Sequence, residues 1–194
     1  MTGIRYLLWD FGDTLVDQRW MWPSPHSVPG WTARFQALID TDLDERWLRG
    51  DMTTAEVAAI FASDLGTTAE ELMAHIELLC ADLQFYEHAW TVARERALPQ
   101  AIVTLNPDLF SDLIVPNYAL DTVFDEIVTS WQERTLDKAQ LCTIALERLG
   151  GHDPGEALLI DNVSENVEAW RALGGRAYLF RGDTEFLADG LPLA

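Results

Sequence analysis

The sequence predicts an α/β protein built on a doubly wound, Rossmann-like parallel sheet of about five strands, with an inserted all-helical segment. The first supporting observation is alternation, because short segments that are apolar throughout are separated by segments with helical periodicity. The second is that strands apolar at every position are typical of a parallel sheet covered by helices on both faces. The third is one long stretch, residues 31–96, in which the apolar residues follow helical spacing and no strand pattern occurs.

Each expected strand is a short apolar segment that stops at polar or turn-forming residues. The expected strands are residues 4–9, 99–104, 127–129, 157–160 and 177–180. Helices are expected between them, because Pro107 suits the first turn of a helix running toward Val115. Lys138 begins a second segment of helical periodicity, and Val167 and Trp170 have helical spacing in a third. Glycine pairs at 150–151 and 174–175 end the last two helices.

The long helical stretch contains its own start signals. Thr53 and Glu56 have the spacing of a capping box, and so do Thr68 and Glu71. Each pair precedes a run of apolar residues at helical spacing, and Gly66 separates the two runs. The stretch is therefore expected to be a bundle of several helices.

The predicted domains are a helical cap, residues 18–91, and an α/β core formed by residues 1–17 and 92–194. A segment rich in proline and tryptophan links the first strand to the cap. Two interpretations stay open for the tryptophans of this region, which either pack the linker onto the body or wall a substrate pocket. These tryptophans are Trp20, Trp22 and Trp31.

The composition limits the class of partner. The formal net charge of −19 argues against a nucleic acid or an anionic membrane surface as the main partner. The two cysteines form no metal-site spacing and no disulfide framework. Without a membrane-spanning segment or a signal peptide pattern, we expect a cytoplasmic protein that acts on a small molecule. The oligomeric state stays open.

Polar residues of similar chemistry follow three of the expected strands. Asp10 follows the first strand, Thr104 ends the second, and Asp161 follows the fourth. Parallel strands place their carboxyl ends at one edge of the sheet, where open α/β sheets bind ligands. Two carboxylates at that edge suit Mg²⁺, and an aspartate there can also act as a nucleophile. Lys138, the chain's single lysine, begins a helix that would bring a cation to the same edge.

These residues resemble the motifs of the haloacid dehalogenase superfamily of hydrolases. The resemblance covers nearly the whole chain, and the helical insertion after the first motif is similar to the family's helical cap. The four matching motifs are Asp10-Phe11-Gly12-Asp13-Thr14, Thr104, Lys138 and Ile160-Asp161-Asn162. The resemblance implies a Mg²⁺-dependent phosphatase that acts on a small phosphorylated metabolite.

The resemblance also implies a role for each motif residue. Asp10 is expected to form an aspartyl intermediate, and Asp10, the Gly12 carbonyl and Asp161 are expected to hold Mg²⁺. Thr104 and Lys138 are expected to bind the transferred phosphoryl group. Four further residues are expected beside the site or against the substrate, with Arg134 also the reserve for Lys138. They are Thr14, Asn106, Asn162 and Arg134.

One departure from the family pattern leaves the function open. The position that usually holds a general acid/base aspartate is Gly12, and the aspartate comes one residue later, at Asp13. Asp13 is therefore the candidate acid/base, reaching the leaving group only if the loop differs. Two alternatives to the phosphatase remain: a metal-independent 2-haloacid dehalogenase, and a catalytically weakened family member with a binding or regulatory role.

Overall fold

The structure is a computed structural model that describes residues 3–17, 28–95 and 97–190. Within these residues the chain forms an all-parallel five-stranded sheet in the order β3-β2-β1-β4-β5. All the predicted strands are confirmed. Their bounds are β1 (Tyr6–Trp9), β2 (Gln100–Thr104), β3 (Glu126–Thr129), β4 (Ala157–Asp161) and β5 (Arg176–Leu179).

The central strand β1 lies between β2 and β4. Leu8 aligns with Ala101 on one side and with Leu159 on the other. Every residue of β1, β2 and β4 is buried, because alternate side chains enter apolar layers on opposite faces of the sheet. Leu7 and Trp9 pack into one layer, and Leu8 packs into the other. The doubly wound architecture is thereby confirmed.

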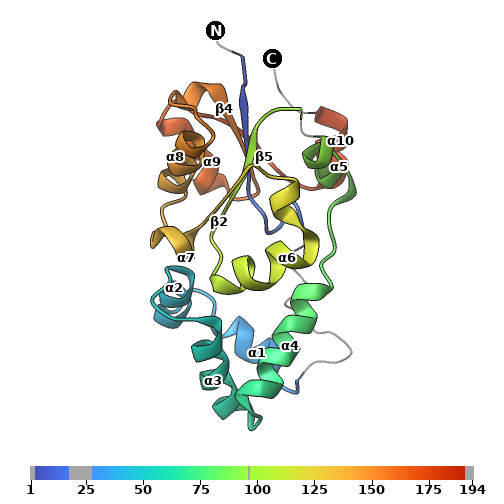
Figure 1. Cartoon of the computed structure of the whole chain (residues 1–194), viewed down its shortest axis with the longest axis vertical. Coiled ribbons are helices and arrows are strands. Elements are labelled where there is room, and N and C mark those ends of the chain that lie inside the picture. Colours follow the sequence, from blue (N-terminus) through green and yellow to red (C-terminus); the bar gives the residue numbers. More distant parts are fainter. Residues whose placement is uncertain (1–2, 18–27, 96, 191–194) are drawn as a thin grey trace.

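Helices cover both faces of the sheet (Figure 1). Helices α8 (Lys138–Arg148) and α9 (Ser164–Ala172) pack on the face of Leu8. Helices α5 (Glu87–Glu95) and α10 (Asp183–Asp189) pack on the opposite face. The helix predicted after Pro107 forms as a π-helical turn, η2 (Phe110–Ile114), that continues into α6 (Val115–Tyr118). The short elements are η3 (Leu120–Thr122), α7 (Ser130–Glu133) and η4 (Pro154–Glu156).

Four further helices gather beyond the carboxyl ends of the strands (Figure 1). They are α1 (Trp31–Gln36), α2 (Asp42–Leu48), α3 (Thr54–Leu65) and α4 (Ala69–Ala81). The capping boxes predicted at Thr53 and Thr68 are both confirmed, at the starts of α3 and α4. Trp31 is buried among Phe35, Phe61 and His75, so this tryptophan packs the helices together. Trp20 and Trp22 lie outside the described residues.

Two connections join the α1–α4 helices to the sheet, and they pair with each other. Val16 and Phe85 form an antiparallel bridge, and the Asp17 N–H donates to the Gln84 carbonyl at 2.8 Å. Helix α5 follows directly and is bound to α10, since the backbone N–H groups at its start donate to the Asp183 carboxylate. The boundary predicted between residues 91 and 92 therefore falls inside a helix packed on the sheet. We propose that the cap ends near Gln84 instead.

Candidate active site

The candidate site lies at the carboxyl edge of the three central strands. Asp10 follows β1, Thr104 ends β2 and Asp161 ends β4, and the order β2-β1-β4 makes the three neighbours. A cavity of about 180 Å³ opens at this edge. The residues that line it are Asp10, Gly12, Thr104, Leu105, Asn106, Lys138, Asn162, Val163 and Asn166. The convergence expected from the sequence thus brings Asp10, Thr104 and Lys138 to one cavity.

A tight turn after β1 sets the direction of the first motif. The Phe11 carbonyl accepts the N–H groups of Leu15 at 2.9 Å and of Val16 at 3.1 Å. Asp13 has a φ of +52°, and its N–H donates to the Val16 carbonyl at 2.7 Å. Gly12 lines the cavity, whereas Asp13 is not among the described residues that do. The structure therefore places Asp13 beside the site and not in its wall.

Lys138 forms the centre of the site. Asp137 caps α8 by accepting the Gln140 N–H, and this fixes Lys138 as the first residue of the helix. Its Nζ lies 2.5 Å from Asp10 Oδ1 and 3.1 Å from Asp161 Oδ2, and only 4% of the residue is exposed. The helix start thus delivers one cation between two buried carboxylates. The lysine has the place predicted for it.

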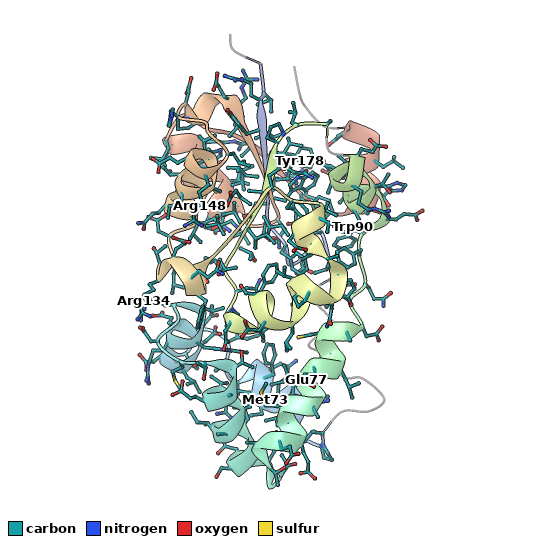
Figure 2. The ribbon with its side chains drawn as sticks, in the orientation of Figure 1. Met73, Glu77, Trp90, Arg134, Arg148 and Tyr178 are labelled. Carbon is teal, nitrogen blue, oxygen red and sulfur yellow. The ribbon has the colours of Figure 1, made fainter. Side chains whose placement is uncertain are left out.

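Arg134, the reserve for Lys138, lies outside the site. It is at the edge of the molecule beside α2 (Figure 2). Its guanidinium donates to the Gly50 carbonyl at 2.9 Å and pairs with Asp51 at 2.5 Å. The prediction that Arg134 joins the site is wrong, because a left-handed backbone at its position, with φ of +55°, ends α7 there. Arg134 instead holds the segment between α2 and α3 against the sheet domain.

Burial and neighbouring charges shift the pKa values of Asp10 and Lys138. Burial raises the pKa of Asp10 to about 6, with a further rise from Asp161 opposed by the ammonium of Lys138. Burial alone would lower the pKa of Lys138, but the two carboxylates outweigh it and hold that pKa above its usual value. Lys138 is consequently a permanent cation at neutral pH. The raised pKa makes Asp10 easier to protonate than an ordinary aspartate.

Asp161 lies behind the cavity wall and does not line it. It is completely buried, and its Oδ1 accepts the Val163 N–H at 2.8 Å. The Asn166 amide donates to both oxygens, at 3.1 and 3.2 Å, and Lys138 binds Oδ2. Asn166 was not among the predicted site residues. Its signal is the spacing from Asp161, which puts it on the first turn of α9 facing the strand end.

The polar groups in the cavity wall are oriented by their neighbours. The Asn106 amide donates to Thr104 Oγ1 at 2.7 Å, which leaves the threonine proton available to a ligand. The Thr14 hydroxyl lies 3.4 Å from both Asp10 Oδ2 and Asn162 Oδ1. Of the four residues predicted beside the site, Asn106 and Asn162 line the cavity, and Thr14 lies directly behind it.

The oxygen donors suit a hard cation such as Mg²⁺. Asp10, Gly12 and Asn162 all line the cavity and carry carboxylate, carbonyl and amide oxygens. Magnesium typically takes one or two carboxylates and completes its shell with water and phosphate. That Asp161 is a direct ligand stays a prediction; its two oxygens accept hydrogen bonds from Val163, Asn166 and Lys138. Among the described residues no group of three or more His, Cys, Asp or Glu side chains could hold a metal.

Comparison with solved structures identifies the fold. The chain matches a predicted HAD-like family hydrolase from Porphyromonas gingivalis with a TM-score of 0.75 at 14% identity, over 97% of this chain and 96% of that one. The chain has the haloacid dehalogenase fold. No protein-family model matches the chain, and no curated protein sequence does. No helix within the described ranges is long and apolar enough to cross a membrane.

The chain also matches two solved structures with a known ligand or activity. One is a HAD family enzyme from Bacteroides thetaiotaomicron in complex with magnesium and inorganic phosphate. It has a TM-score of 0.72 and 15% identity, over 93% of this chain and 96% of that one. The other is L-2-haloacid dehalogenase from Xanthobacter autotrophicus, with a TM-score of 0.66 and 22% identity, over 97% and 84%.

Proposed function

We propose that this protein is a Mg²⁺-dependent phosphatase that hydrolyses a small phosphorylated metabolite through an aspartyl-phosphate intermediate on Asp10. The observation that carries the proposal is the contact of Asp10 with Lys138 in a cavity that also holds the Thr104 hydroxyl. The Bacteroides thetaiotaomicron enzyme, which has the same fold, binds magnesium and inorganic phosphate, and this supports the substrate class. A cavity of about 180 Å³ favours a small substrate. We place the reaction in the cytoplasm.

The first chemical step belongs to Asp10. Its carboxylate attacks phosphorus, so that an O–P bond to Asp10 forms while the bond from phosphorus to the leaving oxygen breaks. The leaving oxygen departs with the bonding electron pair. Water then attacks phosphorus, so that a new O–P bond forms while the O–P bond to Asp10 breaks, which releases inorganic phosphate and restores the carboxylate. The proton that the water loses goes to solvent, and the leaving oxygen takes one from solvent. Lys138 fixes the orientation of Asp10 for both steps through its bond to Oδ1.

Thr104 and Lys138 are proposed to bind the phosphoryl oxygens. The Asn106 amide donates to the Thr104 oxygen and leaves the hydroxyl proton free to bind a phosphoryl oxygen, and Lys138 brings a buried ammonium to the same cavity. Such groups act most strongly when they are oriented before the substrate arrives.

Charge accounting favours a divalent cation. Asp10 and Asp161 outweigh Lys138 by one negative charge, and a phosphate dianion would add two more. We propose that Asp10, the Gly12 carbonyl and Asn162 hold Mg²⁺, with Asp161 acting through its charge. When bound, the metal would neutralise charge on the phosphoryl oxygens.

The proposal is tested by hydrolysis of p-nitrophenyl phosphate and acetyl phosphate with Mg²⁺ and with excess EDTA. We expect turnover that requires Mg²⁺ and falls by on the order of 10³-fold or more in Asp10→Asn, as for loss of a covalent nucleophile. Asp112→Asn is the matched control, because Asp112 is an exposed aspartate outside the cavity. Equal rates in the wild type and Asp10→Asn would overturn the proposal.

The same preparations separate the two alternatives. The haloacid dehalogenase from Xanthobacter autotrophicus shares the fold, so 2-chloropropionate is offered in the presence of EDTA and halide release is measured. Metal-independent halide release would replace the phosphatase by a dehalogenase. Binding of inorganic phosphate without turnover of either substrate would favour the binding or regulatory role.

A further inference from the structure

The loop that follows β2 is attached to the helices α2 and α3. The backbone N–H of Thr54, the first residue of α3, donates to both oxygens of Asp108 at 2.9 Å. The Thr54 hydroxyl donates to the same carboxylate. Asp108 is 8% exposed and Thr54 is 3% exposed, so water competes little for these bonds. Asp108 also places a negative charge at the amino terminus of a twelve-residue helix, where the helix dipole favours it.

A second attachment reaches the same loop through Ser130. The buried Ser130 hydroxyl lies 2.7 Å from the Leu48 carbonyl at the end of α2 and 3.3 Å from the Asn106 carbonyl. The indole N–H of Trp47 adds a bond to the Thr54 hydroxyl at 3.2 Å. Residues 47–54 are thus bound to the loop at two points.

The last residue of β2 and the attached loop together supply three residues of the cavity wall. Thr104, Leu105 and Asn106 lie within four residues of Asp108, and Asn106 orients the Thr104 hydroxyl. If α3 moved away, Asp108 would lose both of its Thr54 donors, the backbone N–H and the hydroxyl, and the loop would lose its anchor. A buried carboxylate without donors is unfavourable, so loop and helix hold their positions together.

We propose that Asp108 is a positioning residue, through which the docking of α3 sets the Thr104 hydroxyl for binding the phosphoryl group. This rests on the proposed phosphatase function. Asp108 does not line the cavity, and it acts through the backbone of residues 104–108. The helices α2 and α3 thereby control the affinity of the site for phosphate without contributing a side chain to the described cavity wall.

The test compares Asp108→Asn with the wild type in two measurements. We expect the dissociation constant for inorganic phosphate with Mg²⁺, measured by calorimetry, to rise about tenfold, as for loss of hydrogen bonds to a charged group. We expect KM for p-nitrophenyl phosphate to rise by a similar factor, with a smaller change in kcat. Asp112→Asn, an exposed aspartate on η2, is the control that should match the wild type.

Two further variants keep the test decisive. Thr54→Val removes one donor to Asp108 and should weaken phosphate binding less than Asp108→Asn, while Thr54→Ser should restore it. If Asp108→Asn does not fold, the Thr54 pair is measured instead. If a folded Asp108→Asn or Thr54→Val variant binds phosphate as tightly as the wild type, the positioning role of Asp108 is overturned. The proposed phosphatase function is not affected by that result. A wild type that neither binds phosphate nor hydrolyses the ester overturns the proposed function, and the inference with it.

Discussion

The ammonium of Lys138 lies 2.5 Å from a carboxylate oxygen of Asp10, a residue 128 positions earlier in the chain. The same ammonium lies 3.1 Å from Asp161, so two buried anions share one cation. A buried charge is tolerated only while its partners remain in place. The site is therefore a unit in which each charged group depends on the others.

Lys138→Met should destabilise the protein as well as inactivate it. It leaves Asp10 and Asp161 buried without their cation, and breaking a buried pair in this way typically costs about 3–5 kcal/mol. The free energy of unfolding is measured by urea titration in EDTA, so that no metal replaces the ammonium. The double variant Lys138→Met with Asp161→Asn should recover part of the loss. An unchanged unfolding midpoint in the single variant would contradict the claim that Lys138 stabilises the two buried carboxylates.

Gly12 should make the rate sensitive to the leaving group. Neither Gly12 nor the other described residues in the cavity wall, apart from Asp10 and Lys138, has a titratable side chain. Proton donation by a general acid typically raises the rate by about 10²–10⁴-fold. Alkyl phosphates, whose leaving group needs that proton, should therefore be hydrolysed more slowly by this factor, whereas aryl phosphates of low leaving-group pKa should not. The measurement is kcat/KM across a series of aryl phosphates. We expect a steep dependence in the wild type.

Gly12→Asp provides the matched comparison for that series. An aspartate at this position adds a carboxyl group that can donate a proton to the leaving oxygen, so the slope against leaving-group pKa should become shallower. The slowest substrates should gain most, by up to about 10²-fold. Identical slopes in the two proteins would show that proton donation at this position has no part in the reaction.

Gly50→Ala should loosen the attachment of α2 and α3 to the sheet domain. Gly50 has a φ of +79°, and a Cβ there would lie 2.6 Å from the Trp131 carbonyl oxygen. Gly66→Ala is the control, because Gly66 has a φ of +67° with open space around its Cβ position. We expect a loss of about 1 kcal/mol for Gly66→Ala and about 2–4 kcal/mol for Gly50→Ala, measured by thermal unfolding. Equal losses would mean that the close approach to Trp131 is not maintained.

His75 should make stability fall in mild acid. It is 4% exposed and packs edge-on against Trp31, and its Nε2 has no hydrogen-bond partner among the described residues. Burial lowers the pKa of His75 below its ordinary value of 6.5. The unfolded chain therefore binds a proton more readily than the folded one. Stability from this group is complete above pH 6.5 and declines as the pH drops below that value.

The measurement is the free energy of unfolding between pH 5 and 7, compared with His75→Leu. One group contributes a slope of at most about 1.4 kcal/mol per pH unit, and the variant should lose that contribution. His152→Gln, at an exposed histidine, should keep the wild-type slope. If His75→Leu has the same slope as the wild type, His75 is not the responsible group.

The local parts of the fold could be predicted from the sequence because they depend on neighbouring residues. The strands are apolar at every position, and both capping boxes join residues three apart, Thr53 with Glu56 and Thr68 with Glu71. Parallel strands also bring their carboxyl ends to one edge whatever the details of packing. This is why Asp10, Thr104 and Lys138 could be expected in one place.

Residues whose roles depend on distant contacts were not predictable. Asp108 and Ser130 carry no motif, and their importance comes from Thr54 and Leu48, which pack against them only in the folded chain. From its position in the sequence, Arg134 was a second candidate for the cation of the site. Its ion pair with Asp51, which forms only in the folded chain, holds it elsewhere.

The sequence by itself determined the order of strands and helices, the starts of the cap helices and the polar residues that gather at the sheet edge. The tertiary structure decided which oxygens face the cavity: Asp161 is held by Lys138 and Asn166, while Asn162 lines the wall. The physical reason is that strand position fixes where a residue lies. The hydrogen-bond donors around its side chain, which come from distant parts of the chain, decide whether its charge is presented to a ligand or held inside.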